Sequence, residues 1–271
     1  MDITTATGYG KADYTGERMD RTIICMKWGT LYSADYVNVL YNAVRANLHC
    51  EFRFVCLTDD PTRIHSEVET YPIPEFDLRE DLRRIGGWPK IGIFKKDLYG
   101  LRGRALFIDL DMVIIKDLSP FFDLSGGLIA TDMGDNWRPG QRNHVSQPGT
   151  CIFAFTLGEQ PHVYERFISD PNLFSHEYGL EQNFVANHAL DVSCWPIEWV
   201  ISFKRHLRRQ APFGMIGSPK LPPAEAKIVA FHGKPRPHEL IKNGWWGDFP
   251  NLGRGPVPWM QNYWNKYIRM E

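Results

Sequence analysis

Several features that would fix a function class by themselves are scarce in this chain. Only five cysteines occur among its 271 residues, and no two form a Cys-x-x-Cys pair. We therefore expect the reduced, packed thiols of a cytosolic protein, with neither a disulfide scaffold nor a cysteine zinc site. No apolar run reaches the roughly 18 residues of a membrane-spanning helix. The net charge of −1 lacks the basic excess that phosphate-backbone binding usually requires, which argues against nucleic acid as the main partner.

Residues 1–20 are polar and lack the apolar centre of a signal peptide, so we expect them to form a flexible N-terminal tail. The remaining sequence contains no repeat, no low-complexity segment and no clear linker, which predicts a single domain over residues 21–271. Its hydrophobic content of 43%, with nine Trp, eleven Tyr and sixteen Phe, is enough for a sizeable core.

The first half of the chain alternates between strand and helix patterns. An amphipathic helix is predicted at 33–48, with Val37, Leu40, Tyr41, Val44 and Leu48 on one face. Strand, helix, strand, helix, strand is the order typical of a parallel α/β sheet. After residue 125 the pattern loosens. Strands are predicted at 21–27, 51–57, 104–115, 128–132, 150–156 and 226–231, and further helices at 89–99, 161–168 and 178–189.

The predicted strand at 104–115 carries the most informative motif, Asp109-Leu-Asp111, inside an otherwise apolar run. In extended chain, residues i and i+2 project to the same side, so we expect both carboxylates to face one point. Two carboxylates are costly to bury together unless a positive charge lies between them, and hard oxygen ligands suit Mg²⁺ or Mn²⁺. The tripeptide alone is weak evidence, but charged residues rarely interrupt so apolar a run. The motif therefore indicates a metal or acid site.

Polar residues follow several of the predicted strands. In open α/β sheets, ligands bind beyond the carboxyl ends of the strands. If these ends converge, a histidine and two aspartates could share one cation, with Lys234 beside a bound phosphate. A hydrogen-bonded turn histidine is the competing interpretation of His232. The four segments at such positions are 28–29, 59–60, 109–111 and 232–235.

Three segments resemble the GT-A-fold glycosyltransferases, in particular family 8, the glycogenin and lipopolysaccharide galactosyltransferase type. They are Ala-Leu-Phe-Ile-Asp109-Leu-Asp111-Met-Val-Ile-Ile-Lys-Asp-Leu118, Phe231-His232-Gly-Lys-Pro-Arg-Pro237 and Tyr178-Gly-Leu-Glu181-Gln182-Asn183. The resemblance spans roughly residues 22 to 240 and implies an α/β GT-A fold, in which helices flank a Rossmann-like, mostly parallel central sheet and the C-terminal half is elaborated. It further implies a nucleotide-binding half at 21–125, an acceptor and metal half at 126–240 and a C-terminal aromatic segment at 241–271.

The resemblance also implies an activity, namely metal-dependent transfer of a hexose from a UDP-sugar to an acceptor with retention of anomeric configuration. Mn²⁺, or Mg²⁺, would be bound by Asp109, Asp111 and His232. Gln182, with Glu181, would act at the anomeric carbon, because the motifs place no carboxylate clearly as a covalent nucleophile. The residues that would hold the donor are Trp28, Gly29, Tyr32, Asp59, Lys90, Asp109, Gly233 and Lys234.

Two departures from the family pattern leave the donor sugar undetermined. Glu181 stands where relatives have Asp, and Gln147-Pro-Gly-Thr150 stands where they have an Asn-rich segment. The acceptor is equally open and could be a glycan, a lipid-linked molecule or a small metabolite. The sequence does not indicate an oligomeric state.

Two other functions compete with the transferase. Apolar strand followed by Asp-x-Asp also resembles the haloacid-dehalogenase phosphatases, with Asp109 as nucleophile, although about a hundred residues precede the motif here. A non-catalytic sugar-nucleotide-binding module, with tryptophans as stacking platforms, is the second alternative.

Two further segments bear on localisation. The basic stretch Phe203-Lys-Arg-His-Leu-Arg-Arg209 is either a solvated helix or loop, or a site for an anionic acceptor or membrane face. The segment from Trp259 to Arg269 either packs back on the domain or lies on a membrane as an amphipathic helix. We expect a cytoplasmic protein, with peripheral contact at the inner face of the membrane as an open alternative.

Overall fold

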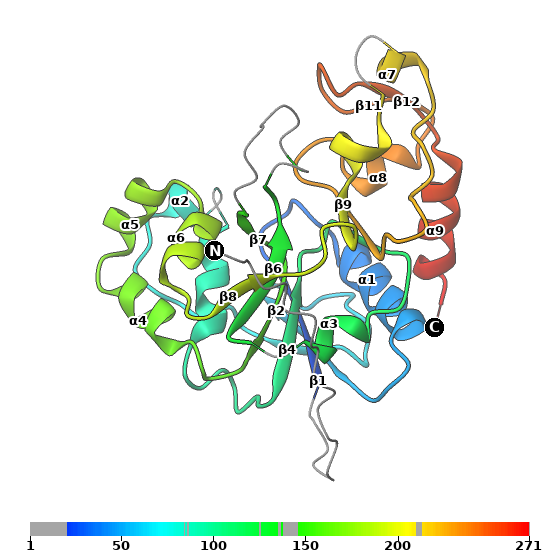
Figure 1. Cartoon of the computed structure of the whole chain (residues 1–271). Coiled ribbons are helices and arrows are strands. Elements are labelled where there is room, and N and C mark those ends of the chain that lie inside the picture. Colours follow the sequence, from blue (N-terminus) through cyan, green and yellow to red (C-terminus); the bar gives the residue numbers. More distant parts are fainter. Residues whose placement is uncertain are drawn as a thin grey trace, which may run out of the picture.

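A seven-stranded mixed sheet forms the centre of the molecule, in the order β3-β2-β1-β4-β7-β6-β8 (Figure 1). The computed structural model describes residues 21–83, 85, 87–124, 126–134, 137, 146–209 and 213–270, so the predicted tail at 1–20 lies outside the described residues. The strands are β1 (Arg21–Lys27), β2 (Arg53–Thr58), β3 (Glu69–Tyr71), β4 (Arg104–Ile108), β6 (Leu128–Asp132), β7 (Pro148–Thr156) and β8 (Val192–Cys194).

The first half of this sheet is parallel, as the strand and helix order predicts. β1 pairs in parallel with β2 and with β4, and β2 pairs in parallel with β3. Helix α1 (Ala34–Asn47) connects β1 to β2, and its predicted apolar face is buried. β7 departs from this pattern, because it runs antiparallel to both β4 and β6, while β6 and β8 are parallel.

A second, smaller sheet begins where the Asp-x-Asp motif ends. It contains β5 (Met112–Ile114), β10 (Ile228–Ala230) and β9 (Val200–Ser202), with β10 antiparallel to β5 and parallel to β9. The predicted continuous strand at 104–115 is therefore wrong. Residues 109–111 form a turn between two sheets, in which the Met112 amide donates to the Asp109 carbonyl at 3.2 Å. A strand hairpin, β11 (Gly244–Trp246) and β12 (Gly253–Gly255), follows near the C-terminus.

The helices differ more from the prediction than the strands do. The predicted helix at 89–99 is a 3₁₀ helix, η1 (Trp88–Phe94), and the helix predicted at 178–189 begins later, as α6 (Glu181–His188). α4 (Pro161–Ile168) has its predicted bounds, and η2 is a π-helical turn at Phe203–Leu207. The others are α2 (Glu80–Arg83), α3 (Pro120–Asp123), α5 (Pro171–Tyr178), α7 (Phe213–Ile216), α8 (Pro237–Leu240) and α9 (Pro258–Ile268).

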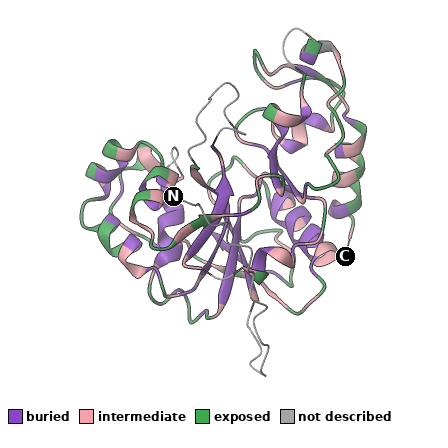
Figure 2. Ribbon diagram, viewed as in Figure 1, coloured by how far each residue is buried: buried purple, intermediate pink, exposed green. Residues whose placement is uncertain are grey.

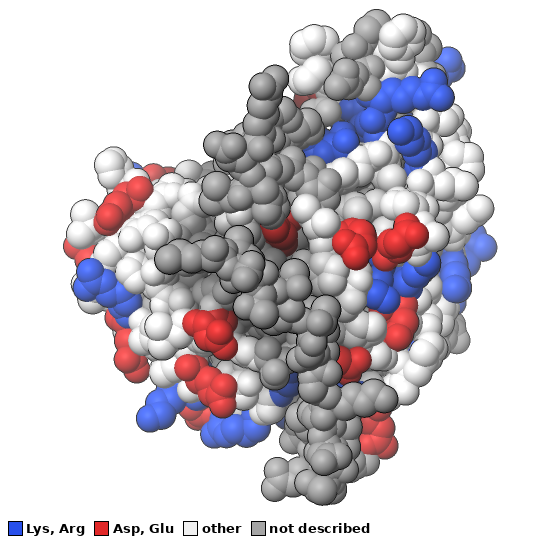
Figure 3. Space-filling model, viewed as in Figure 1, with Lys and Arg blue, Asp and Glu red and all other residues white. Residues whose placement is uncertain are grey.

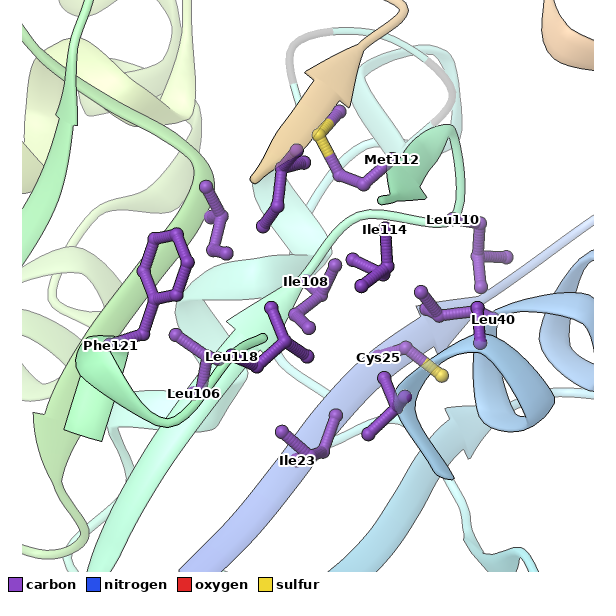
Figure 4. Packing of buried hydrophobic residues seen from close by; sticks show 14 of the residues in the cluster. Ile23, Cys25, Leu40, Leu106, Ile108, Leu110, Met112, Ile114, Leu118 and Phe121 are labelled. Atoms are coloured by element: carbon purple, nitrogen blue, oxygen red, sulfur yellow. The ribbon is translucent and has the colours of Figure 1, made fainter. Parts of the chain in front are cut away.

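Both faces of the central sheet are covered, and its inner strands are buried, whereas the edge strands β3 and β8 are partly exposed (Figure 2). On one face, β1 and β4 pack against α1, α3 and the start of the second sheet, with Ile23, Leu40, Ile108 and Phe121 in the same cluster (Figure 4). On the other face, η1, α4 and α6 cover the sheet through a second apolar cluster around Trp88. This two-sided burial leaves the strand ends as the place for polar groups.

The C-terminal aromatic segment packs back on the domain. The Asn42 side chain on α1 donates to the Tyr267 carbonyl on α9 at 2.7 Å, and the Ile114 amide donates to the Tyr263 hydroxyl at 3.1 Å. Of the helices in the described ranges, none is long and apolar enough to cross a membrane.

Candidate functional site

A cavity of about 270 Å³ opens at the edge of the sheet where β4 ends. It brings together five of the residues singled out from the sequence, Lys90, Asp109, Glu181, Gln182 and His232. Asp109 follows β4 directly, Glu181 begins α6, and His232 follows β10. The remaining lining residues are Gly87, Met133, Trp137, Thr150, Cys151, Leu180 and Ala230.

Lys90 lies at the centre of one wall of this cavity. Its ammonium is 3.2 Å from Asp109 Oδ2 and 3.5 Å from Glu181 Oε2, and it donates to the Thr150 carbonyl at 3.1 Å. Burial alone would lower the pKa of Lys90, but the charges of Asp109 and Glu181 outweigh it and raise the pKa. Lys90 is therefore a permanent cation that holds two carboxylates in place.

Glu181 is almost fully buried beside this lysine. Thr150 Oγ1 donates to Glu181 Oε2 at 2.8 Å, while Glu181 Oε1 is buried and has no hydrogen-bond partner in the described part of the chain. Burial, only partly offset by Lys90, raises the pKa of Glu181 to about 7. Since an unpaired buried carboxyl oxygen is costly, Oε1 is suited to a hydrogen bond with a ligand in the cavity.

Gly87 gives the lysine and the glutamate the room they need. Its φ of +76° is in the left-handed region, and a Cβ there would lie 3.1 Å from Lys90 Cε and 3.3 Å from Glu181 Oε2. A larger residue at this position would strain the turn and push on both side chains.

Asp111 lies beyond Asp109 in the turn and is held by the loop after β1. The Tyr32 hydroxyl donates to Asp111 Oδ2 at 2.8 Å. Burial and, to a lesser degree, the neighbouring charge of Asp109 raise the pKa of Asp111 to about 7. The turn thus brings the two carboxylates close, as the motif predicts, although by a different backbone path.

A divalent cation would find a suitable pair of ligands here. The two acidic side chains repel each other, and hard carboxylate oxygens are what Mg²⁺ and Mn²⁺ bind. Within the described ranges, however, no three His, Cys, Asp or Glu side chains are grouped closely enough to hold a metal. The carboxylate pair therefore fits a cation, and the predicted third ligand, His232, is not gathered with it.

His232 faces the cavity from the second sheet. Its Nε2 is 2.7 Å from Ser202 Oγ at the end of β9, and its ring centroid is 5.3 Å from that of Trp137. Burial lowers the pKa of His232 to about 4, and the charges of Lys204 and Arg205 act in the same direction. The imidazole is therefore neutral at physiological pH, the form that binds metals.

The loops after β1 and β2 meet as predicted for strand ends in one sheet. The Gly29 amide donates to Asp59 Oδ2 at 2.7 Å. Trp28, Gly29 and Asp59 belong to this pair of loops, and Tyr32 links it to Asp111. These loop residues lie next to the residues that line the cavity.

Lys234 and Gly233 lie in the turn after His232. Lys234 is half exposed and forms an ion pair with Asp248, whose Oδ2 is 3.1 Å from the ammonium. The turn needs a glycine, because Gly233 has a φ of +71°.

Several residues of the site were not singled out as site residues from the sequence. In the sequence, Thr150 belongs only to a segment that differs from the family pattern, and no motif marks Ser202 or Trp137. Lys204 was noted only as one of four basic residues in seven. In the sequence, only His232 and this basic run point to the part of the site that lies on the second sheet.

No family model matches the chain, and no curated protein is similar to it in sequence. Its structure is similar to that of the galactosyltransferase LgtC, solved with donor and acceptor sugar analogues, with a TM-score of 0.60 and 13% identity over 92% of this chain and 97% of LgtC. It is also similar to GlyE, a glycosyltransferase of Streptococcus pneumoniae TIGR4 (TM-score 0.57, 12% identity, 93% of this chain and 62% of that one). A third likeness is to the bifunctional glycosyltransferase WbbM (TM-score 0.56, 12% identity, 94% and 50%). The chain thus has the GT-A fold that the motifs predict.

Proposed function

We propose that this protein is a glycosyltransferase that moves a hexose from a UDP-sugar to an acceptor. The observation that carries the proposal is the cavity at the carboxyl end of β4. There Lys90 holds Asp109 and Glu181, and Gln182 and His232 complete the lining. The fold is shared with glycosyltransferases, one of which was solved with donor and acceptor sugar analogues. Position at the strand ends, a mainly apolar lining with a few convergent polar side chains, and the fold all favour the same chemistry.

The leaving group of such a reaction is a nucleoside diphosphate, which must be stabilised as the sugar departs. Mn²⁺ or Mg²⁺, held by Asp109 and Asp111, would stabilise the negative charge on the diphosphate. Burial raises the pKa of Asp109, and Lys90 opposes this shift and fixes the orientation of the carboxylate, while Tyr32 fixes one oxygen of Asp111. The loops around Gly29 and Asp59 are proposed to hold the uridine end.

The sugar would lie between Glu181 and Gln182. The unpaired Oε1 of Glu181 is available to a sugar hydroxyl, and Gln182 lies on the adjoining position of α6.

Retention of anomeric configuration is part of the proposal because the family resemblance implies it. Lys90 holds one oxygen of Asp109 and one of Glu181, which makes these carboxylates poorly suited to act as covalent nucleophiles. We therefore propose front-face substitution, in which the acceptor attacks on the side from which the diphosphate leaves and Gln182 stabilises the developing positive charge.

The test is UDP release from UDP-glucose and UDP-galactose in the presence of Mn²⁺, with and without a panel of sugar acceptors, on wild type and Asp109→Asn. Release by the wild type that falls at least tenfold in the variant supports the transferase. Proton NMR of the first-formed product checks the stereochemistry, and an inverted linkage would contradict retention. Hydrolysis of p-nitrophenyl phosphate with Mg²⁺, together with an aspartyl-phosphate on Asp109, would favour the phosphatase instead. Tight UDP binding without turnover would favour the non-catalytic module.

We also propose that the acceptor is presented at an anionic membrane surface. The C-terminal helix α9 is packed against α1. We therefore assign the membrane contact to the neighbouring region around α7, β11 and β12. Phe213, Trp245 and Phe249 are 69%, 68% and 76% exposed there. Lys and Arg gather over the same region around α7, β11 and β12 (Figure 3). Exposed aromatic side chains among basic ones are typical of interfacial binding to anionic lipids.

Vesicle flotation tests this contact. The triple variant Phe213→Ser, Trp245→Ser, Phe249→Ser should lose most binding to vesicles that contain phosphatidylglycerol. The matched control is Leu173→Ser with Leu190→Ser, which removes side chains that are 54% and 62% exposed on the other side of the molecule. Equal flotation of both variants and the wild type would contradict the proposal.

A further inference from the structure

The π-helical turn η2 directs one lysine of the basic stretch towards the site. Ser202 Oγ accepts a hydrogen bond from the Arg205 amide at 3.2 Å and so caps the turn. Phe203 and Leu207 are buried beneath it, and the Phe203 ring stacks on Phe231 with centroids 4.7 Å apart. With those two side chains fixed in the core, Lys204 is left half-buried beside the turn that contains Gly233. One-turn π-helical insertions occur frequently at functional sites.

The Lys204 ammonium lies against the turn that follows His232. A Cβ on Gly233 would be 3.6 Å from Lys204 Nζ. Burial and the charge of Arg205 lower the pKa of Lys204, while the charge of Asp111 opposes them. Lys204 therefore lies beside the Gly233 turn and within electrostatic reach of Asp111.

Lys204 differs from the other lysines near the site in having no ion pair with a described residue. Lys90 is paired with Asp109 and Glu181, Lys27 with Asp60, and Lys234 with Asp248. A partly buried ammonium without an ion-pair partner is unfavourable in the ligand-free protein, and a bound anion would relieve that cost.

We propose that Lys204, together with the backbone of Gly233, binds the diphosphate of the nucleotide donor. This inference rests on the proposed function. It assigns to Lys204 the contact that the sequence resemblance gives to Lys234, whose ammonium is already paired with Asp248. A phosphate oxygen can approach Gly233 closely because that residue lacks a Cβ, and the lysine supplies a charge-assisted hydrogen bond at the same point.

The experiment is calorimetry with UDP and with UMP in the presence of Mn²⁺ on wild type, Lys204→Gln, Lys204→Arg, Lys234→Gln and Arg205→Gln. Lys204→Gln should weaken UDP binding about 10- to 100-fold and UMP binding less, because UMP lacks the second phosphate. Lys204→Arg should recover most of the affinity. Arg205→Gln removes the same charge from the exposed neighbouring residue and should change the UDP affinity less than threefold, as should Lys234→Gln.

The outcomes separate this inference from the proposed function. If the wild type binds UDP and Lys204→Gln binds it equally well, the assignment of Lys204 is overturned. A loss confined to Lys234→Gln, or an equal loss in Arg205→Gln, also overturns it. If the wild type does not bind UDP at all, the proposed function fails together with the inference. Thermal unfolding of each variant shows that the fold is kept, so that a loss of affinity reports on the contact.

Discussion

The two walls of the cavity are built in opposite ways. The wall on the central sheet is a closed network, in which Lys90, Asp109, Thr150 and Glu181 bond with one another. The wall on the second sheet is open. There His232 bonds to Ser202, while Lys204 has a half-buried ammonium without an ion pair in the described ranges.

This difference separates two binding tasks. A network whose cation is already paired with carboxylates is suited to an uncharged, hydroxyl-rich ligand, because its ammonium is not free for an anion. An unpaired cation beside a glycine turn is suited to an anion. The sheet wall would thus hold the sugar, and the second wall, with the Asp109–Asp111 pair, would hold the metal and diphosphate.

Breaking the closed wall should have the largest effect. Lys90→Met removes the cation between two carboxylates, and removal of one partner from a buried ion pair typically costs about 3 to 5 kcal/mol. We expect a loss of this order in the free energy of unfolding, measured by urea denaturation at pH 8. Lys96→Met, at an exposed position, is the control and should cost less than about 0.5 kcal/mol. A loss below about 1 kcal/mol in Lys90→Met would show that the network is not a charged one.

A change at the mouth of the same wall should affect turnover and spare the fold. Gln182→Ala should lower the rate of UDP release from the donor about 10- to 100-fold, because a hydrogen bond that stabilises the transition state typically contributes about 1.5 to 3 kcal/mol when a charged group is involved. UDP affinity should stay within twofold, since the sugar is absent from that ligand. Asn187→Ala, exposed on the same helix, should leave both quantities unchanged. If Gln182→Ala lowered the UDP affinity by the same factor as the rate, Gln182 would be assigned to the diphosphate and not to the sugar.

Stability should depend on pH through Glu181. Its pKa in the folded protein is about 7, above the ordinary 4.5, so the folded state binds this proton more tightly than the unfolded state. The stability linked to this group is therefore fully present below about pH 4.5 and is lost as the pH rises to about 7, by about 1 to 3 kcal/mol for the ligand-free protein. Glu181→Gln should flatten the fall in melting temperature between pH 5 and pH 8. An unchanged slope would contradict the assignment.

The open wall should be less sensitive to a single substitution. Ser202→Ala removes a hydrogen bond to His232 and the cap of η2, and each such contact typically contributes about 0.5 to 1 kcal/mol. We expect a loss of about 1 kcal/mol in unfolding free energy and a lower UDP affinity, because both His232 and Lys204 lose their positioning. Ser169→Ala, at an exposed helix end, serves as the control. No change in UDP affinity would mean that the second wall is positioned by its apolar core alone.

Part of the central sheet and of the helices that cover it was predictable from local pattern. The strands at 21–27 and 128–132 and the helix at 161–168 have their predicted bounds, because apolar periodicity and a proline at the helix start act locally. The Asp-x-Asp turn was predicted as extended chain, since the apolar run continues on both sides of it and nothing local shows that β4 and β5 belong to different sheets.

The open wall depends on contacts between distant residues. The place of Lys204 is set by the parallel pairing of β9 with β10 and by the stacking of Phe203 on Phe231. The partnership of Lys90 with Glu181 likewise joins residues far apart in the sequence. Residue type and spacing cannot show which basic residue of a run faces the site, and β9 itself, three residues long, gives too short a pattern to predict.

Calorimetric titration of UDP, with Mn²⁺ and then with EDTA, on wild type and Asp111→Ala tests the central claim most directly. The account predicts binding by the wild type that requires the metal and is lost in the variant, because the carboxylate pair would no longer hold the cation. If the wild type does not bind UDP with Mn²⁺ present, the assignment of this cavity to a sugar-nucleotide donor is contradicted.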